Sequence, residues 1–238
     1  MWAGATLFQM KRISRFIPFG LAATVLLAAA GPAAALQGVT VTGRVTMLEQ
    51  GERTSGDVGQ AVVWLTGSLA PTGVPGTTEM ATEGKQFVPH LRIVARGASI
   101  SFPNHDPFNH NVFSVSPESP FDLGVFGRGE VQAANFDRAG VVRIFCNVHA
   151  QMRGVVLVLD TGLSTQPGAD GRFSLADVPP GDYTLHAWHE RAPEVTRPLR
   201  VRTDAAVPPQ LTLDARGYRL VQHRDKEGKS YGDRSRRY

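Results

Sequence analysis

The strongest constraint in the sequence is the heptapeptide CNVHAQM at residues 146–152, which holds the only cysteine of the chain. It places a thiol, an imidazole and a thioether at intervals of three residues, and a second imidazole, His110, lies upstream. Sulfur and imidazole side chains are good ligands for transition metals. A lone Cys is often just a small buried apolar residue, but four donors in this pattern favour a metal site.

Copper is the metal that this donor set suits. A plane of two His and one Cys with a weak axial Met is the ligand arrangement of blue-copper electron-transfer sites. Soft sulfur favours Cu(I) and imidazole suits Cu(II), so a protein that holds both donor types in one geometry lets the ion change charge with little rearrangement. The residues therefore predict one copper ion that alternates between Cu(I) and Cu(II).

The sequence around these donors resembles the cupredoxin family, and the Cys-x₂-His-x₂-Met spacing is most similar to the amicyanin branch of it. The segments that carry the resemblance are FVP at 87–89, ISFPNHD at 100–106, HNVF at 110–113 and CNVHAQMRGVVLV at 146–158. The resemblance implies that His110, Cys146 and His149 are equatorial ligands and that Met152 is axial. It also implies that Asn111 ties the two ligand loops together and supports the ligands from behind.

Three other histidines are candidate ligands. His105 is the alternative to His110, but it precedes an Asp-Pro pair typical of a turn, whereas His110 leads into an apolar, strand-like stretch. His105 is therefore predicted to be a loop residue. His186 and His189 fall on opposite faces of a predicted strand, so we expect them to be surface or rim residues of the second predicted sandwich rather than to share a metal.

Residues 1–35 read as a secretory signal, with a basic start, an apolar stretch over 16–30 and three alanines at 33–35. An uncleaved membrane anchor is the alternative, but Pro and Gly interrupt the apolar stretch. We expect cleavage, a periplasmic or secreted protein, and no stable membrane insertion afterwards. In an oxidising compartment an unpaired thiol is a liability, and metal ligation at Cys146 would remove it.

Charge patterning argues against nucleic acid as a partner. The net charge of +4 depends on the basic signal segment and on the basic residues 216–238, so the body between them is mildly acidic. No stretch interleaves basic and aromatic residues as a nucleic-acid surface does. Residues 216–238 are predicted to be a disordered tail, or else a segment that steers the protein to an anionic partner or membrane face.

The pattern along the chain predicts an all-β protein. Apolar residues alternate from Val39 to Val45 and form a continuous run over 61–65, which indicates two strands within residues 36–68. Residues 67–84 and 107–126 read as loops because they are rich in Gly or Pro. The resemblance implies that residues 69–160 form a cupredoxin Greek-key β-sandwich, and the alternation along 142–146 predicts that Cys146 points inward at the end of a strand.

A second motif follows the first domain. Residues 170–175 (DGRFSL) and 178–185 (VPPGDYTL) resemble the carboxypeptidase-regulatory-like, or prealbumin-type, β-sandwich, here assigned to residues 161–215. The opening strands of that family are missing at this place but are present within 36–68. The copper domain is therefore predicted to be inserted into a smaller sandwich; alternatively, residues 36–68 add strands to the cupredoxin.

The residues and the resemblances together predict a periplasmic blue-copper protein that carries single electrons between redox proteins and is not an enzyme. Similarity to methylamine-utilisation proteins suggests an amine-oxidation chain. The main alternative is a copper-binding or copper-delivery protein without electron transfer. An enzyme would need an additional open copper site, and an adhesion or structural role would rest on the second sandwich.

Overall fold

The computed structural model describes residues 38–50, 56–67, 76–202 and 208–231. Their regular structure consists of β-strands and one short 3-10 helix, η1 (Val58–Gln60). This confirms the predicted all-β class. The predicted signal, residues 1–35, lies outside the described residues. Within the described part of the chain, no helix is long and apolar enough to cross a membrane.

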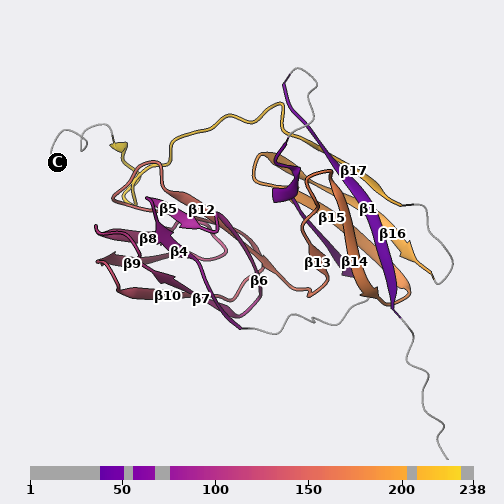
Figure 1. The fold of residues 1–238 in the computed structure, drawn as a ribbon, viewed down its shortest axis with the longest axis horizontal. Helices are drawn as coiled ribbons and strands as arrows, with labels where there is room; N and C mark the ends of the chain where they lie inside the picture. Colours follow the sequence, from indigo (N-terminus) through magenta and orange to yellow (C-terminus); the bar gives the residue numbers. More distant parts are fainter. Residues whose placement is uncertain (1–37, 51–55, 68–75, 203–207, 232–238) are drawn as a thin grey trace, which may run out of the picture. The chain divides into compact units, whose positions relative to one another are not determined.

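The first β-sandwich contains a five-stranded sheet in the order β6-β12-β11-β8-β9 and a three-stranded sheet in the order β10-β7-β3, with a β4-β5 hairpin beside them (Figure 1). Apolar side chains from both sheets meet in one buried cluster, which includes Ile100, Phe102, Phe136 and Ile144. The strands are β3 (Thr77–Glu79), β4 (Ala81–Glu83), β5 (Gln86–Val88), β6 (Leu91–Ala95), β7 (Ala98–Pro103), β8 (His110–Ser114), β9 (Phe121–Phe126), β10 (Val131–Phe136), β11 (Gly140–Phe145) and β12 (Arg153–Leu159).

Strand β11 shows how the sandwich aims the thiol. Val142 and Ile144 are buried while Arg143 between them is exposed, as the period of two in a strand requires. Cys146 continues the buried series just after the strand ends and belongs to the same apolar cluster. The predicted inward direction of the Cys146 side chain is confirmed.

The second β-sandwich contains a three-stranded sheet in the order β14-β1-β17 and a four-stranded sheet in the order β13-β2-β15-β16 (Figure 1). Its core is a separate cluster that includes Val45, Leu65, Leu185 and Leu213. Its strands are β1 (Val39–Leu48), β2 (Val62–Gly67), β13 (Ser164–Thr165), β14 (Arg172–Val178), β15 (Gly181–His189), β16 (Ala192–Val201) and β17 (Gln210–Asp214).

The two N-terminal strands pair with strands from the other end of the chain. β1 lies antiparallel to β14 and parallel to β17, and β2 lies antiparallel to β15. Residues 38–48 and 62–67 therefore belong to the sheets of the second sandwich. On this basis we propose that the domain of residues 69–160 is inserted between the second and third strands of a sandwich formed by 36–68 and 161–215.

A third buried cluster joins the strands of the two sandwiches. Val62, Trp64 and Trp188 come from β2 and β15, and they pack with Val155, Leu157 and Leu159 of β12. β12 is thus buried on both faces, because its alternate residues Val156 and Val158 belong to the core of the first sandwich. This explains the nearly continuous apolar run over 155–159.

Three sequence predictions of irregular structure are wrong. Residues 76–84 contain β3 and β4, and residues 107–126 contain β8 and β9. The tail is not disordered over 216–231, where Tyr231 and Asp225 are buried and hydrogen-bonded. Prolines mislead at 107–126 because they fall between the strands, where they break no strand hydrogen bond. The remaining tail residues, 232–238, lie outside the described residues.

The pairing of β2 with β15 predicts which strands a cavity in the core of the second sandwich will destabilise. Leu65 is fully buried in the core of the second sandwich, so Leu65→Ala should lower the free energy of unfolding by about 2–5 kcal/mol. Amide hydrogen exchange should accelerate more in β15 and β17 than in β7 and β11. The control Thr40→Ala, on an exposed position of β1, should change stability by less than about 0.5 kcal/mol. Faster exchange confined to β7 and β11 would contradict the assignment.

Candidate metal centre

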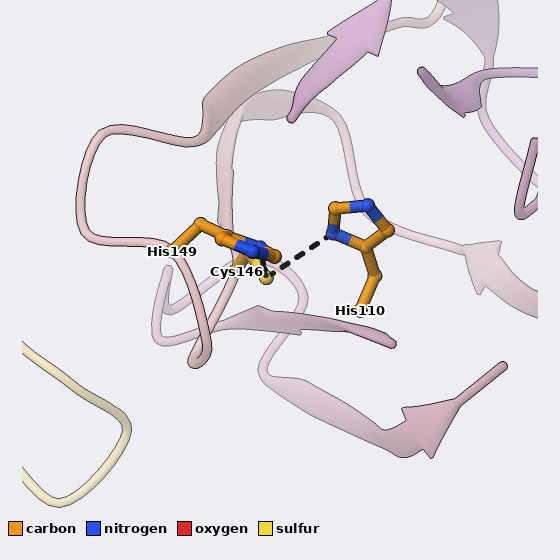
Figure 2. Close-up of side chains that lie close together, drawn as sticks. All are labelled: His110, Cys146 and His149. Atoms are coloured by element: carbon orange, nitrogen blue, oxygen red, sulfur yellow. Dashed lines mark hydrogen bonds between the residues drawn. The ribbon is translucent and has the colours of Figure 1, made fainter. Parts of the chain in front are cut away.

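His110 is the first residue of β8, and its ring is fully buried. One ring nitrogen, Nε2, lies 2.7 Å from Oδ2 of Asp106, four residues earlier in the loop before the strand. A carboxylate in that place accepts a hydrogen bond from the Nε2–H group and leaves Nδ1 with a free lone pair. The Nδ1 atom lies 3.7 Å from the sulfur of Cys146 (Figure 2). The pair therefore sets both the tautomer and the direction of the imidazole.

Asp106 is itself held by the turn between β4 and β5. Its carboxylate accepts hydrogen bonds from the backbone amides of Gly84, at 2.8 Å, and Lys85, at 3.0 Å. Burial by itself raises the pKa of Asp106, but the bonds from Lys85, His110 and Gly84 outweigh it and lower the pKa below its usual value. The group is ionised at neutral pH and remains the acceptor for His110.

Cys146 follows β11 and has no exposed surface. Its own backbone N–H donates to the carbonyl of Met152, at 3.1 Å, which closes the loop of residues 146–152 at its base. Burial raises the pKa of the Cys146 thiol, and the amides of Asn111, Val148 and His149 oppose this rise. Since a thiolate is the form that binds a metal, metal binding here must release the thiol proton.

His149 lies in the middle of the loop and is half-buried. Its carbonyl accepts a 3.0 Å hydrogen bond from the backbone N–H of Met152, and its Nδ1 atom lies 3.6 Å from the sulfur of Cys146. Burial lowers the pKa of His149, and the charges of His110 and Lys85 lower it further against the opposing effect of Asp106. The imidazole is therefore neutral at neutral pH, with a lone pair available for a metal.

The three donors are spaced as one metal ion requires. Metal–nitrogen and metal–sulfur distances of ~2.0 and ~2.3 Å, in a trigonal plane, place the sulfur about 3.7 Å from each nitrogen. The observed separations are 3.7 Å to His110 and 3.6 Å to His149, and the donor atoms of all three residues lie within 4.8 Å of one another. Both rings turn toward the sulfur (Figure 2). The residues present thus fit a single ion bound by His, Cys and His.

Met152 and Asn111 lie beside this cluster. Met152 is buried, and its side chain belongs to the same apolar cluster as Cys146. Asn111, the residue after His110, accepts a 3.2 Å hydrogen bond from the backbone N–H of Asn147 and donates to Asp122 and to the carbonyl of Gly124, each at 2.7 Å. A single side chain therefore connects the loop of residues 146–152 to β8 and β9.

The other histidines lie outside the cluster. His105 is exposed. His186 stacks on Trp64 and is bonded to Thr66 and Glu194, while His189 is buried beside Asp57. The surface or rim position expected for His189 is therefore wrong, because the period of two places it on the same face of β15 as the buried Leu185 and Ala187. Among the described residues, the only group of His, Cys, Asp or Glu suited to a metal ion is His110, Cys146 and His149.

Asp106 is the residue of the site that sequence reasoning missed. Its spacing could have indicated this role, because Asp106 lies four residues before His110 in the segment NHDPFNH. The sequence pattern by itself indicates only a turn at the Asp-Pro pair. Asp106 has both roles. It lies in the loop that reverses the chain before β8, and this loop directs its carboxylate toward His110.

Comparisons with known proteins give distant likenesses. No protein-family model matches the sequence, and no curated protein matches it. A purple cupredoxin from Nitrosopumilus maritimus is 19% identical over 34% of this chain and 99% of its own, with a TM-score of 0.32. A reduced amicyanin variant is 19% identical over 40% of this chain and 99% of its own, with a TM-score of 0.33.

A third solved structure, a copper-containing nitrite reductase from Thermus scotoductus, is 25% identical over 40% of this chain, with a TM-score of 0.33. The matched region spans 24% of that chain. Likenesses at these TM-scores support no functional statement about this chain.

The contact between Asp106 and His110 predicts how metal affinity responds to one carboxylate. Asp106→Asn keeps an oxygen near Nε2 but removes the charge that favours the correct tautomer, so Cu(II) affinity should fall about ten- to hundredfold in a chelator competition assay. Asp160→Asn is the matched control, because Asp160 pairs with Arg96 at the surface. Equal affinities for the wild type and Asp106→Asn would contradict this role.

Proposed function

We propose that this protein is an exported carrier of single electrons that binds one copper ion through His110, Cys146 and His149. The observation that carries the proposal is the preset triangle of one sulfur and two imidazole nitrogens at separations of 3.6 and 3.7 Å. Copper bound there would supply a Cu(I)/Cu(II) couple, because this donor set suits both oxidation states.

The protein's own part is to keep the donors in place while the charge changes. Asp106 fixes the ring of His110, the bond to Met152 fixes the backbone of Cys146, and the bond from Met152 fixes that of His149. Donors that are held by rigid strands and by second hydrogen bonds need little movement when the metal changes charge. The buried positions of His110 and Cys146 also exclude water as a competing ligand.

We propose Met152 as a weak axial ligand. Its backbone bonds to Cys146 and His149 place it at the closing position of the loop, and its side chain is buried in the same apolar cluster as Cys146. A thioether at long distance is the axial group of blue-copper sites, where it tunes the potential.

The half-buried edge of His149 is the proposed route for electrons. Phe108 packs edge-on against both imidazoles, with ring centroids 5.3 Å from His110 and 5.4 Å from His149. Val148 is 47% exposed, and the ammonium of Lys85 lies 5.1 Å from the Phe108 ring. A small, mainly apolar face with one cation suits brief encounters with redox proteins, whose interfaces are small.

The proposed location is the periplasm or the cell exterior, because residues 1–35 have the pattern of a secretory signal. The proposed partners are an electron donor and an electron acceptor, with an amine-oxidation chain as the suggested setting. Copper delivery is the alternative function that the accessible edge of His149 favours, since delivery needs exchangeable ligands. Slow copper release together with fast electron exchange would favour the carrier.

The proposal is tested by titrating the purified protein with Cu(II) under optical and electron-paramagnetic-resonance spectroscopy. We expect an intense visible band and a narrow copper hyperfine splitting that saturate at one equivalent, because the thiolate binds copper directly. Cys146→Ser should abolish the band. A pale protein with an ordinary tetragonal copper signal would contradict the proposal.

The axial assignment predicts a change of potential. Met152→Leu should keep the visible band but raise the reduction potential, because the lost thioether helps to stabilise Cu(II). A tenfold loss of Cu(II) affinity relative to Cu(I) corresponds to about 59 mV, which voltammetry resolves. Met47→Leu, in the core of the second sandwich, is the matched control and should leave the potential unchanged. An unchanged potential in Met152→Leu would place the axial ligand elsewhere.

A further inference from the structure

The segment of residues 216–231, here called the C-terminal strap, follows β17 and contacts the loop that holds Cys146. It leaves β17 at Ala215, whose backbone N–H donates to the carbonyl of Leu48 in the second sandwich, at 2.9 Å. Its last described residue, Tyr231, is buried and donates from its hydroxyl to the carbonyl of Cys146, at 3.0 Å. The strap therefore connects the end of the second sandwich to the candidate metal centre.

The strap has an ordered turn of its own. Oδ1 of Asp225 accepts hydrogen bonds from the backbone amides of Glu227, at 3.1 Å, and Lys229, at 2.7 Å. The backbone of Asp225 also exchanges hydrogen bonds with Lys229 and Gly228. Gly228 has a φ of 78°, a conformation that favours glycine. A segment with this internal bonding presents Lys226 and Tyr231 in a defined geometry.

The strap and Asn111 together hold one peptide unit, the one between Cys146 and Asn147. Its carbonyl accepts from the Tyr231 hydroxyl, and its N–H donates to Oδ1 of Asn111 at 3.2 Å. A peptide unit is planar, so bonds at both ends fix its rotation. That rotation is the ψ angle of Cys146, which orients the residue that carries the sulfur.

Further contacts hold the strap against the same place. The backbone N–H of Lys226 donates to Oδ1 of Asn147, at 3.0 Å, and its ammonium lies 2.6 Å from Oδ2 of Asp122. The other oxygen of Asp122 accepts from Asn111. The strap thus bonds directly to Asn147, which follows Cys146, and is linked through Asp122 to Asn111, which follows His110.

Aromatic packing supports these bonds. The ring of His223 stacks on Phe145, with centroids 4.6 Å apart and planes 27° apart, and meets Tyr231 edge-on at 5.1 Å. Phe145 is the last residue of β11, directly before Cys146. The strap therefore contacts the chain immediately before and immediately after the cysteine.

We propose that the C-terminal strap is a positioning element for the metal centre and that Tyr231 is its main positioning residue. The inference rests on the proposed copper function for its purpose, but the contacts themselves exist without metal. By fixing the peptide unit after Cys146, the strap keeps the sulfur aimed at the two imidazoles. Loss of the strap should loosen the loop of residues 146–152 and speed the release of copper.

The test is amide hydrogen exchange, followed by NMR, on the full chain without metal. Tyr231→Phe removes only the hydroxyl, so exchange at Asn147 and Met152 should become about five- to tenfold faster, the effect of one lost hydrogen bond. Amides in β1 and β15 should be unchanged, which a general loss of stability would not produce. The matched control is Tyr218→Phe, in the same strap, which removes a hydroxyl that makes none of the bonds to the loop described above.

A second variant tests the strap without changing Tyr231, whose ring packs against His223. Gly228→Ala forces an L side chain into the φ of 78° and disturbs the turn at a distance from the loop. It should also accelerate exchange at Asn147, by about two- to fivefold. Exchange at Asn147 equal to that of the wild type in both Tyr231→Phe and Gly228→Ala would overturn the proposal.

Copper release provides the second readout. In wild-type protein loaded with one equivalent, release to a strong chelator should be about five- to tenfold slower than in Tyr231→Phe and equal to that in Tyr218→Phe. Failure of the wild type to bind copper would overturn the proposed function. The hydrogen-exchange data would still test whether the strap positions the loop of residues 146–152. Copper binding with identical release from Tyr231→Phe and Tyr218→Phe would overturn the strap alone.

Discussion

The structure depends on three donor atoms, one sulfur and two imidazole nitrogens, that face one point and belong to residues held by hydrogen bonds. Nε2 of His110 bonds to Asp106, and the backbones of Cys146 and His149 bond to that of Met152. The sulfur of Cys146 lies 3.7 and 3.6 Å from Nδ1 of His110 and of His149, and the burial of Cys146 and His110 keeps water away from these two donors.

The sandwich supplies rigid supports from distant parts of the chain. β8 brings His110 and β11 brings Cys146, and the two strands are neighbours in one sheet. The core beneath them is built of large apolar side chains, among them Phe102, Phe126 and Ile144, and such cores are packed too densely to deform freely. Cys146 and His149 lie in the loop of residues 146–152, outside the strands, and Asn111 and the C-terminal strap bond to this loop.

Much of the site could be predicted from short-range pattern. The period of two along 142–146 correctly placed the thiol inward, while the choice of His110 over His105 as a ligand stays a prediction. The spacing within CNVHAQM brought His149 to the sulfur because one short loop spans both residues. The axial role of Met152 stays a prediction, although its burial agrees with it.

The rest could not be read from pattern because it depends on long-range contacts. β3, β8 and β9 lie among Gly and Pro residues whose effect depends on where the strand hydrogen bonds fall. The basic composition of 216–238 indicated disorder, but the order of 216–231 comes from the turn at Asp225 and from the burial of Tyr231. The partners of β1 and β2 lie more than a hundred residues away along the chain, where only motif resemblance suggested them.

The most direct measurement is a pair of crystal structures of the full chain, one without metal and one loaded with copper, with anomalous scattering recorded at the copper edge. We expect one anomalous peak between the sulfur of Cys146 and the Nδ1 atoms of His110 and His149. These three atoms should shift by less than about 0.5 Å between the two structures if the proposed site is correct. A copper peak elsewhere, or a loop of residues 146–152 that rearranges on binding, would contradict it.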